Sequence, residues 1–151
     1  MKVAFFMQDT GAVYGAERAT IDLASGLRAV GVSVRFFLMR ESRLDEKSAF
    51  LDALANEGFE TRSFPVAGRV SLRLARSVRR AFVEEQVEVL HVIGYKANLH
   101  AALAGIRPRI TTVHGWLFRD DPKERFYAAI ERWCLRRCDR VICLSSFYER
   151  L

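Results

Sequence analysis

The first stretch of the chain, residues 1–23, constrains the fold more than any other. Residues 3–7 form a short apolar run of the kind found in strands that are buried on both faces of a sheet. A polar loop containing Gly11 and Gly15 follows, and from Ala16 onward apolar residues recur at roughly helical spacing. This order of strand, glycine loop and helix places free backbone N–H groups at a helix N-terminus, where they face an anion or a sugar. The spacing lacks the G-x-G-x-x-G dinucleotide fingerprint and the ending of a P-loop, so it does not by itself identify a ligand.

Strands and helices alternate along the rest of the chain. Five further strands are predicted, at residues 32–38, 59–64, 87–93, 109–113 and 140–144, and Pro65 is expected to close the third strand of the chain. Helices are predicted between the strands, at residues 16–30, 48–56, 70–85, around 99–103 and 121–137, and another begins at Ser145. Short connections between alternating strands and helices predict an α/β fold, a Rossmann-like doubly wound parallel sheet with helices on both faces.

Ligands bind such sheets outside the carboxyl ends of the strands. Four loops that carry glycines and polar groups follow predicted strands, at residues 11–15, 65–68, 94–96 and 114–115. We expect these loops to meet along one edge of the sheet.

The composition fits one globular domain. The chain has 151 residues, of which 50% are hydrophobic and 28% charged, with a net charge of +6. The three cysteines argue against a disulfide framework and indicate a reducing, cytoplasmic compartment. Cys134 and Cys138 share a helix face, and without a second pair of ligands they are interpreted as core thiols and not as a metal site. No apolar run approaches the roughly 20 residues of a membrane span.

Four motifs resemble those of a known enzyme family, in the same order and spacing. Residues 14–18, Tyr-Gly-Ala-Glu-Arg, resemble the Gly-Gly-Ala-Glu-Arg segment of the family 4 retaining glycosyltransferases of GT-B fold. Residues 89–94 resemble the family's fourth strand and its loop, residues 110–115 its Thr-Val-His-Gly stretch, and residues 138–146 the segment that closes its N-terminal domain. Tyr14 replaces the family's usual glycine and is expected to narrow the loop that faces the acceptor.

The resemblance implies that residues 1–151 are the N-terminal, acceptor-side domain of such an enzyme. In the family a second Rossmann-like domain holds the nucleotide sugar, and this C-terminal donor-binding domain is expected to lie outside the sequence, in the same chain or in another. The implied reaction is transfer of a sugar from a nucleotide sugar to a glycan or lipid-linked acceptor, as in the synthesis of cell-envelope polysaccharides. The isolated chain is expected to be inactive, and no metal ion or other cofactor is expected.

The resemblance also assigns site residues. His114 matches the family histidine that lies beside the transferred sugar, with Gly115 after it; a loop residue that only forms hydrogen bonds is the alternative. Gly15, with the N–H groups of Ala16 and Glu17, is expected to face the donor diphosphate or the acceptor. The alternative for Gly15 is a glycine required only for a turn with positive φ. Weaker acceptor candidates, for which a solvated loop is the alternative, are Gly94, Tyr95 and Lys96.

The basic excess is concentrated in one predicted helix. Four of its arginines recur at spacings of three and four residues and form a stripe: Arg69, Arg73, Arg76 and Arg80. This pattern is typical of a helix that lies on anionic lipid headgroups, and Trp116 and Phe118 follow in a loop beside the expected site. We therefore expect peripheral binding to an anionic membrane surface, on its inner face; the alternative is the solvated face of a helix packed on the sheet. No nucleic-acid recognition motif accompanies the charge, so nucleic acid is not an expected partner.

Two other functions remain open. One is a non-catalytic binding or membrane-docking subunit that recruits a separate donor-binding chain. The other is a generic doubly wound nucleotide-binding or regulatory domain, although the sequence lacks the acidic cluster that such regulatory domains phosphorylate.

Overall fold

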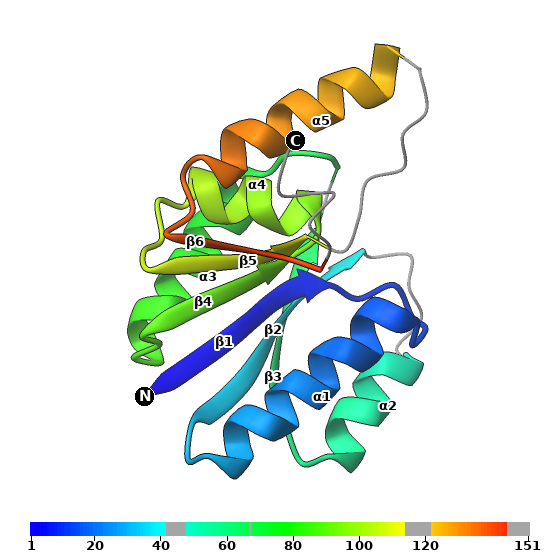
Figure 1. The fold of residues 1–151 in the computed structure, drawn as a ribbon, viewed down its shortest axis with the longest axis vertical. Helices are drawn as coiled ribbons and strands as arrows, with labels where there is room; N and C mark the ends of the chain where they lie inside the picture. The colour runs from blue at the N-terminus through cyan, green and yellow to red at the C-terminus, as the bar shows by residue number, and fades with distance from the viewer. Residues whose placement is uncertain (42–47, 67, 114–121, 145–151) are drawn as a thin grey trace.

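The computed structural model describes residues 1–41, 48–66, 68–113 and 122–144. Within them, six parallel strands form one sheet in the order β3-β2-β1-β4-β5-β6 (Figure 1). The strands are β1 (Lys2–Gln8), β2 (Ser33–Glu41), β3 (Glu60–Val66), β4 (Val89–Ile93), β5 (Arg109–Val113) and β6 (Arg140–Cys143). The helices of the described residues are α1 (Gly15–Ala29), α2 (Ala49–Asn56), α3 (Leu72–Glu84), α4 (Tyr95–Leu103) and α5 (Pro122–Leu135). The predicted Rossmann-like α/β fold is confirmed.

Helices cover both faces of the sheet because neighbouring residues of a strand point to opposite faces. On one face, Phe5 and Phe36 of β1 and β2 share an apolar core with Ile21 of α1 and with α2. On the other face, Phe6 and Phe37 share a second core with α3 and α4, and α5 packs against α4 on that side (Figure 1). The apolar run of β1 is thus buried on both faces, as the sequence predicts.

The strand order reverses between β1 and β4. From β1 the chain proceeds outward through β2 to the edge strand β3, with α1 and α2 as the connections. Helix α3 then returns it to β4, on the other side of β1. Helices α1 and α4 therefore follow neighbouring strands but pack on opposite faces. Between their N-termini lies the topological switch point, where doubly wound sheets bind ligands.

Several element boundaries differ from the predictions: β2 continues to Glu41, and β4 begins only at Val89. Two further differences concern the edge strand and α4. Strand β3 continues through Pro65 to Val66. Proline has no backbone N–H, but β3 is an edge strand that pairs with β2 alone, and an edge strand tolerates proline because a missing N–H on its free side removes no hydrogen bond from the sheet. Helix α4 begins at Tyr95, because Gly94 precedes it at φ 88° and ψ 152°, a conformation that is essentially restricted to glycine. The prediction of a loop at Tyr95 and Lys96 was therefore wrong, and both residues lie in the first helical turn.

A carboxylate held by two arginines ties the end of α3 to the strands beside it. Glu85, whose side chain is 14% exposed, accepts a hydrogen bond from Arg62 Nη1 at 2.8 Å and pairs with Arg35. Burial acts to raise the pKa of Glu85, but the hydrogen bonds from Arg62 and Arg35 outweigh burial and hold that pKa below its ordinary value. The charged form of Glu85 therefore stabilises the fold.

Candidate functional site

The N-terminus of α1 lies at the switch point, just beyond the carboxyl end of β1. The first hydrogen bond of α1 runs from the Arg18 N–H to the Tyr14 carbonyl oxygen, at 3.0 Å. The N–H groups of Gly15, Ala16 and Glu17 precede this bond and have no acceptor within the helix. They are the donors that the sequence assigns to a ligand, and the fold presents them at the carboxyl edge of the sheet.

Gly15 is not explained by the fold of the described residues. Its φ is not positive, so the interpretation as a turn glycine was wrong. A Cβ atom added at Gly15 would meet no other atom within 4 Å, so close packing does not require glycine either. Gly15 is exposed at the first position of α1. A glycine in this position leaves room for a ligand close to the helix N-terminus.

The side chain of Glu17 serves α1 itself. Its carboxylate accepts the Tyr14 N–H at 3.0 Å, and the residue is 6% exposed. A negative charge here also complements the positive end of the helix dipole. Glu17 therefore contributes its backbone N–H to the mouth of the site, while its side chain orients the start of the helix.

Asp9, which the sequence analysis missed, organises the loop after β1. Its carboxylate is fully buried and accepts hydrogen bonds from the Gly11 N–H at 2.9 Å, from Ser48 Oγ at 2.7 Å and from Arg40 Nε at 3.1 Å. The Ala49 N–H also donates to the Gly11 carbonyl oxygen at 3.0 Å. These hydrogen bonds connect the loop before α1 to β2 and to the start of α2. An aspartate two residues before a glycine, directly after a strand, was the available sequence signal.

Lys96 is paired and is not a free cation. Its Nζ lies 3.1 Å from Glu41 Oε1, at the end of β2, and Gln8 Nε2 donates to the same oxygen at 3.1 Å. The three side chains link the carboxyl ends of β1 and β2 to the first turn of α4. Lys96 therefore presents a partly neutralised charge to the site, and Glu41 and Gln8 are neighbours that sequence reasoning missed.

Tyr95 lies where α4 meets α5. Its ring centroid is 5.5 Å from that of Tyr127, and Tyr127 in turn lies 6.1 Å from Phe126. The Tyr95 side chain remains exposed, as does Phe126. The structure thus places an accessible aromatic surface at the N-terminus of α4.

Two further histidines are buried and have structural partners. His91 Nε2 lies 2.7 Å from Thr112 Oγ1, and its ring lies 4.9 Å from that of Phe5. His100 Nε2 accepts the Ser71 N–H at 3.1 Å, so Nδ1 carries the proton and donates to the Lys96 carbonyl oxygen at 2.7 Å. Burial lowers the pKa of His100, which favours this neutral form. His100 therefore joins α4 to the start of α3.

The remaining predicted site residues lie outside the described residues. They are His114, Gly115, Trp116 and Phe118. Residue His114 directly follows β5, the strand next to β4.

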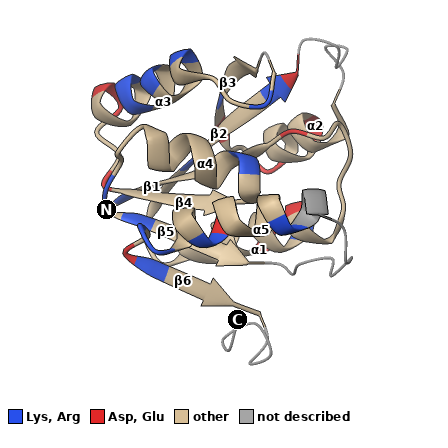
Figure 2. Cartoon of the chain, turned by 90° about the horizontal axis from the view of Figure 1, so that it is seen from above, with Lys and Arg blue, Asp and Glu red and all other residues tan. Residues whose placement is uncertain are grey.

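The arginine stripe lies on the exposed face of α3 and just before its start. Leu74, Ala75, Val78 and Ala81 form the buried face of the helix, and the blue segments of the α3 ribbon in Figure 2 mark its Lys and Arg positions. Four exposed arginines have no hydrogen-bond or ion-pair partner among the described residues: Arg69, Arg73, Arg76 and Arg80. This arrangement fits a membrane-facing helix and a solvated helix equally.

The cysteines form no metal site in the part of the chain that the structure describes. No group of three or more His, Cys, Asp or Glu side chains in this part has the arrangement of a metal site. Cys134 is fully buried, and burial raises the pKa of its thiol to about 11, as expected for a core thiol. Among the same residues, no helix is long and apolar enough to cross a bilayer.

Comparison with known proteins identifies the family. The profile of Glycosyltransferase Family 4 matches residues 13–151, and the chain belongs to this family. A comparison with curated proteins finds no match.

Solved structures with the same fold include three bacterial proteins. The lipopolysaccharide outer core galactosyltransferase WaaB superposes with a TM-score of 0.72 at 13% identity, over 99% of this chain and 41% of WaaB. Anabaena Alr3699/HepE, in complex with UDP, superposes with a TM-score of 0.69 at 20% identity, over 93% of this chain and 37% of HepE. Acinetobacter baumannii MurG superposes with a TM-score of 0.66 at 14% identity, over 95% of this chain and 41% of MurG. The chain thus has the fold of one part of these proteins and spans about two fifths of their length.

Proposed function

We propose that this chain is the acceptor-side half of a retaining glycosyltransferase that transfers a sugar from a nucleotide sugar to a glycan or lipid-linked acceptor. The observation that carries the proposal is Gly15, an exposed glycine at the switch point that neither its backbone conformation nor its packing requires. Membership of Glycosyltransferase Family 4 supports the reaction class. The complex of HepE with UDP and glucose supports a nucleotide sugar as the donor.

In this proposal the residues of the chain bind and orient the acceptor. The N–H groups of residues 15–17 stabilise negative charge at the mouth of the site. The exposed ring of Tyr95 and the partly neutralised Lys96 line the acceptor side, next to Gly94. His114 lies against the transferred sugar, with Gly115 after it. A second, donor-binding domain, in the same chain or in another, holds the nucleotide sugar, and no metal ion or cofactor is assigned a role.

A transfer assay tests the proposal. Labelled nucleotide sugars are incubated with glycan and lipid extracts, first with the chain alone and then with the chain joined to or mixed with a donor-binding domain. Product is expected only in the second case, because the chain alone lacks the contacts to the donor that the transition state requires. Transfer by the isolated chain would show that it is not an acceptor-side half. No transfer in any combination would favour a non-catalytic docking subunit.

We further propose that the arginine stripe of α3 binds an anionic membrane surface, on the cytoplasmic side. The supporting observation is that Arg73, Arg76 and Arg80 are exposed and have no partner among the described residues. Each contributes about 1 kcal/mol near an anionic surface, and salt weakens the attraction because the Debye length is about 10 Å at 0.1 M. Vesicle co-sedimentation with anionic and with neutral lipid measures the binding. Equal sedimentation of the wild type and of the variant with all three arginines changed to glutamine would exclude this role.

A further inference from the structure

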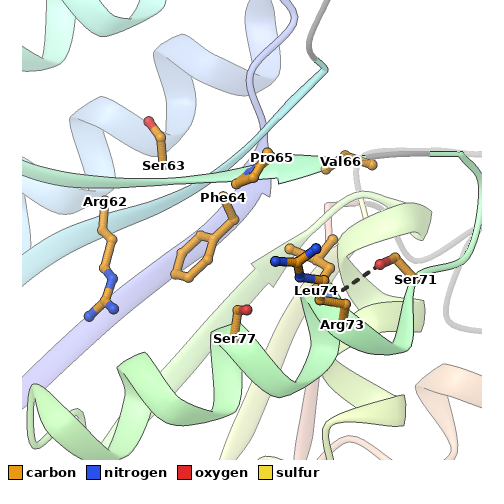
Figure 3. A pocket seen from close by; sticks show the side chains of 9 residues that line it. All are labelled: Arg62, Ser63, Phe64, Pro65, Val66, Ser71, Arg73, Leu74 and Ser77. Atoms are coloured by element: carbon orange, nitrogen blue, oxygen red, sulfur yellow. Dashed lines mark hydrogen bonds between the residues drawn. The ribbon is translucent and has the colours of Figure 1, made fainter.

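A groove between the edge strand β3 and helix α3 is separate from the switch point. Its volume is about 480 Å³, and side chains from both elements face the space between them (Figure 3). Phe64 and Leu74, both buried, form an apolar floor. Ser77 adds a hydroxyl group, and Arg62 and Arg73 contribute one guanidinium group from each element, whereas the Ser63 side chain points to the opposite face of β3 (Figure 3).

The two arginines of the groove differ in their partners. Arg62 donates to Glu85 at 2.8 Å and to Glu84 at 3.3 Å, so two carboxylates balance its charge. Arg73 has no hydrogen-bond or ion-pair partner among the described residues. Neither does the hydroxyl group of Ser77. The groove therefore combines one unbalanced guanidinium group with the Ser77 hydroxyl group and an apolar floor.

We propose that this groove binds a phosphate ester, with the phosphate at Arg73 and the remainder of the ligand on Phe64 and Leu74. A guanidinium group donates two parallel hydrogen bonds to two oxygens of a phosphate. A neutral sugar has no such pair of negatively charged acceptors. The Ser77 hydroxyl group supplies a further donor to the phosphate oxygens. The apolar floor suits the hydrocarbon of a lipid or the apolar face of a sugar ring.

The position of the groove relates it to the proposed reaction. Arg73 and Ser71 belong to the start of α3, beyond the carboxyl end of β3, and Gly15 lies beyond the carboxyl end of β1. Only β2 separates β3 from β1 in the sheet, so the two strands are about 10 Å apart. An acceptor whose phosphate lies in the groove can therefore extend along this edge of the sheet to Gly15. The identification of this ligand as the acceptor of the reaction rests on the proposed function. The binding of a phosphate ester in the groove does not.

Binding is measured by amide NMR on the complete 151-residue chain, without any donor. The soluble arm compares glucose 1-phosphate with glucose, and the lipid arm compares nanodiscs of phosphatidylglycerol with nanodiscs of phosphatidylcholine. The phosphorylated sugar or the anionic lipid is expected to shift the amides of residues 62–64 and 71–77. Shifts with glucose 1-phosphate identify a sugar phosphate as the ligand class. With phosphatidylglycerol alone, shifts that include residues 62–64 of β3 identify a lipid headgroup in the groove, whereas shifts confined to α3 would come from the arginine stripe and would count against the groove.

A matched pair of variants separates the groove from diffuse charge. Arg73→Gln is expected to weaken binding about tenfold, because a charge-assisted hydrogen bond is lost. Arg76→Gln removes another exposed arginine one turn along α3, outside the groove, and is expected to weaken the binding of glucose 1-phosphate less than about twofold; the pair is compared in the soluble arm, because Arg76 belongs to the stripe proposed to bind anionic lipid. Equal weakening by both variants, or no shift of the groove amides in either arm, would overturn the proposal. Because no sugar is transferred, this result is independent of the transfer assay.

Discussion

Substitution of Gly15 by alanine separates a requirement of function from a requirement of the fold. Gly26 is a matched control, because it lies in the same helix, is exposed, has no positive φ and, like Gly15, would place a Cβ atom in open space. An alanine at either position restricts the unfolded chain and favours the helix. We therefore expect Gly15→Ala and Gly26→Ala each to raise the free energy of unfolding by up to about 0.4–1 kcal/mol.

The two variants should differ in activity. In the enzyme assembled with its donor-binding domain, Gly15→Ala places a methyl group where the proposal places the ligand, and turnover should fall about tenfold or more, a barrier increase of about 1.4 kcal/mol. Gly26→Ala lies about three turns from the site and should leave turnover unchanged. Urea denaturation and the transfer assay measure the two effects. Unchanged turnover in Gly15→Ala would refute the reasoning, and so would a loss of stability, because the open space at Gly15 predicts none.

Three further predictions concern single side chains. Glu85→Gln should lower the free energy of unfolding by about 1.5–3 kcal/mol at pH 7. The folded-state pKa of Glu85 is lowered, so its contribution is present above the unfolded value of about 4.3 and is lost as the pH falls through the folded value; urea titrations of wild type and variant should converge as the pH falls below that lowered pKa. Asp9→Ala removes a buried carboxylate with three donors and should cost about 3–5 kcal/mol, whereas the exposed Asp22→Ala should change stability by less than about 0.5 kcal/mol, as thermal unfolding would show. In the assembled enzyme, His114→Ala should reduce turnover about tenfold or more with little change in melting temperature, and normal turnover would leave His114 a structural residue.

The position of Lys96 illustrates why part of the candidate site was not predictable. The sequence places Lys96 after a strand, but it does not show that Glu41, 55 residues earlier, lies 3.1 Å from its Nζ atom. The same holds for Asp9, whose partner Ser48 lies 39 residues away along the chain. Such pairs form only when the order of the strands brings their carboxyl ends together. By contrast, the prediction that the glycine-containing loops lie along one edge of the sheet could be made from the sequence, because it depends only on the strands being parallel.

The sequence by itself determined the alternation of strands and helices, the parallel sheet and the glycine loop before α1. These features depend on apolar periodicity and on stop signals that act over a few residues, so they can be read locally. Only the tertiary structure decided that β3 is an edge strand that tolerates Pro65, that Tyr95 belongs to a helix, and that Gly15 is free of packing. The first and the last of these depend on which strand or side chain is the neighbour in space, and the start of α4 at Tyr95 depends on the backbone conformation that Gly94 adopts in the folded chain.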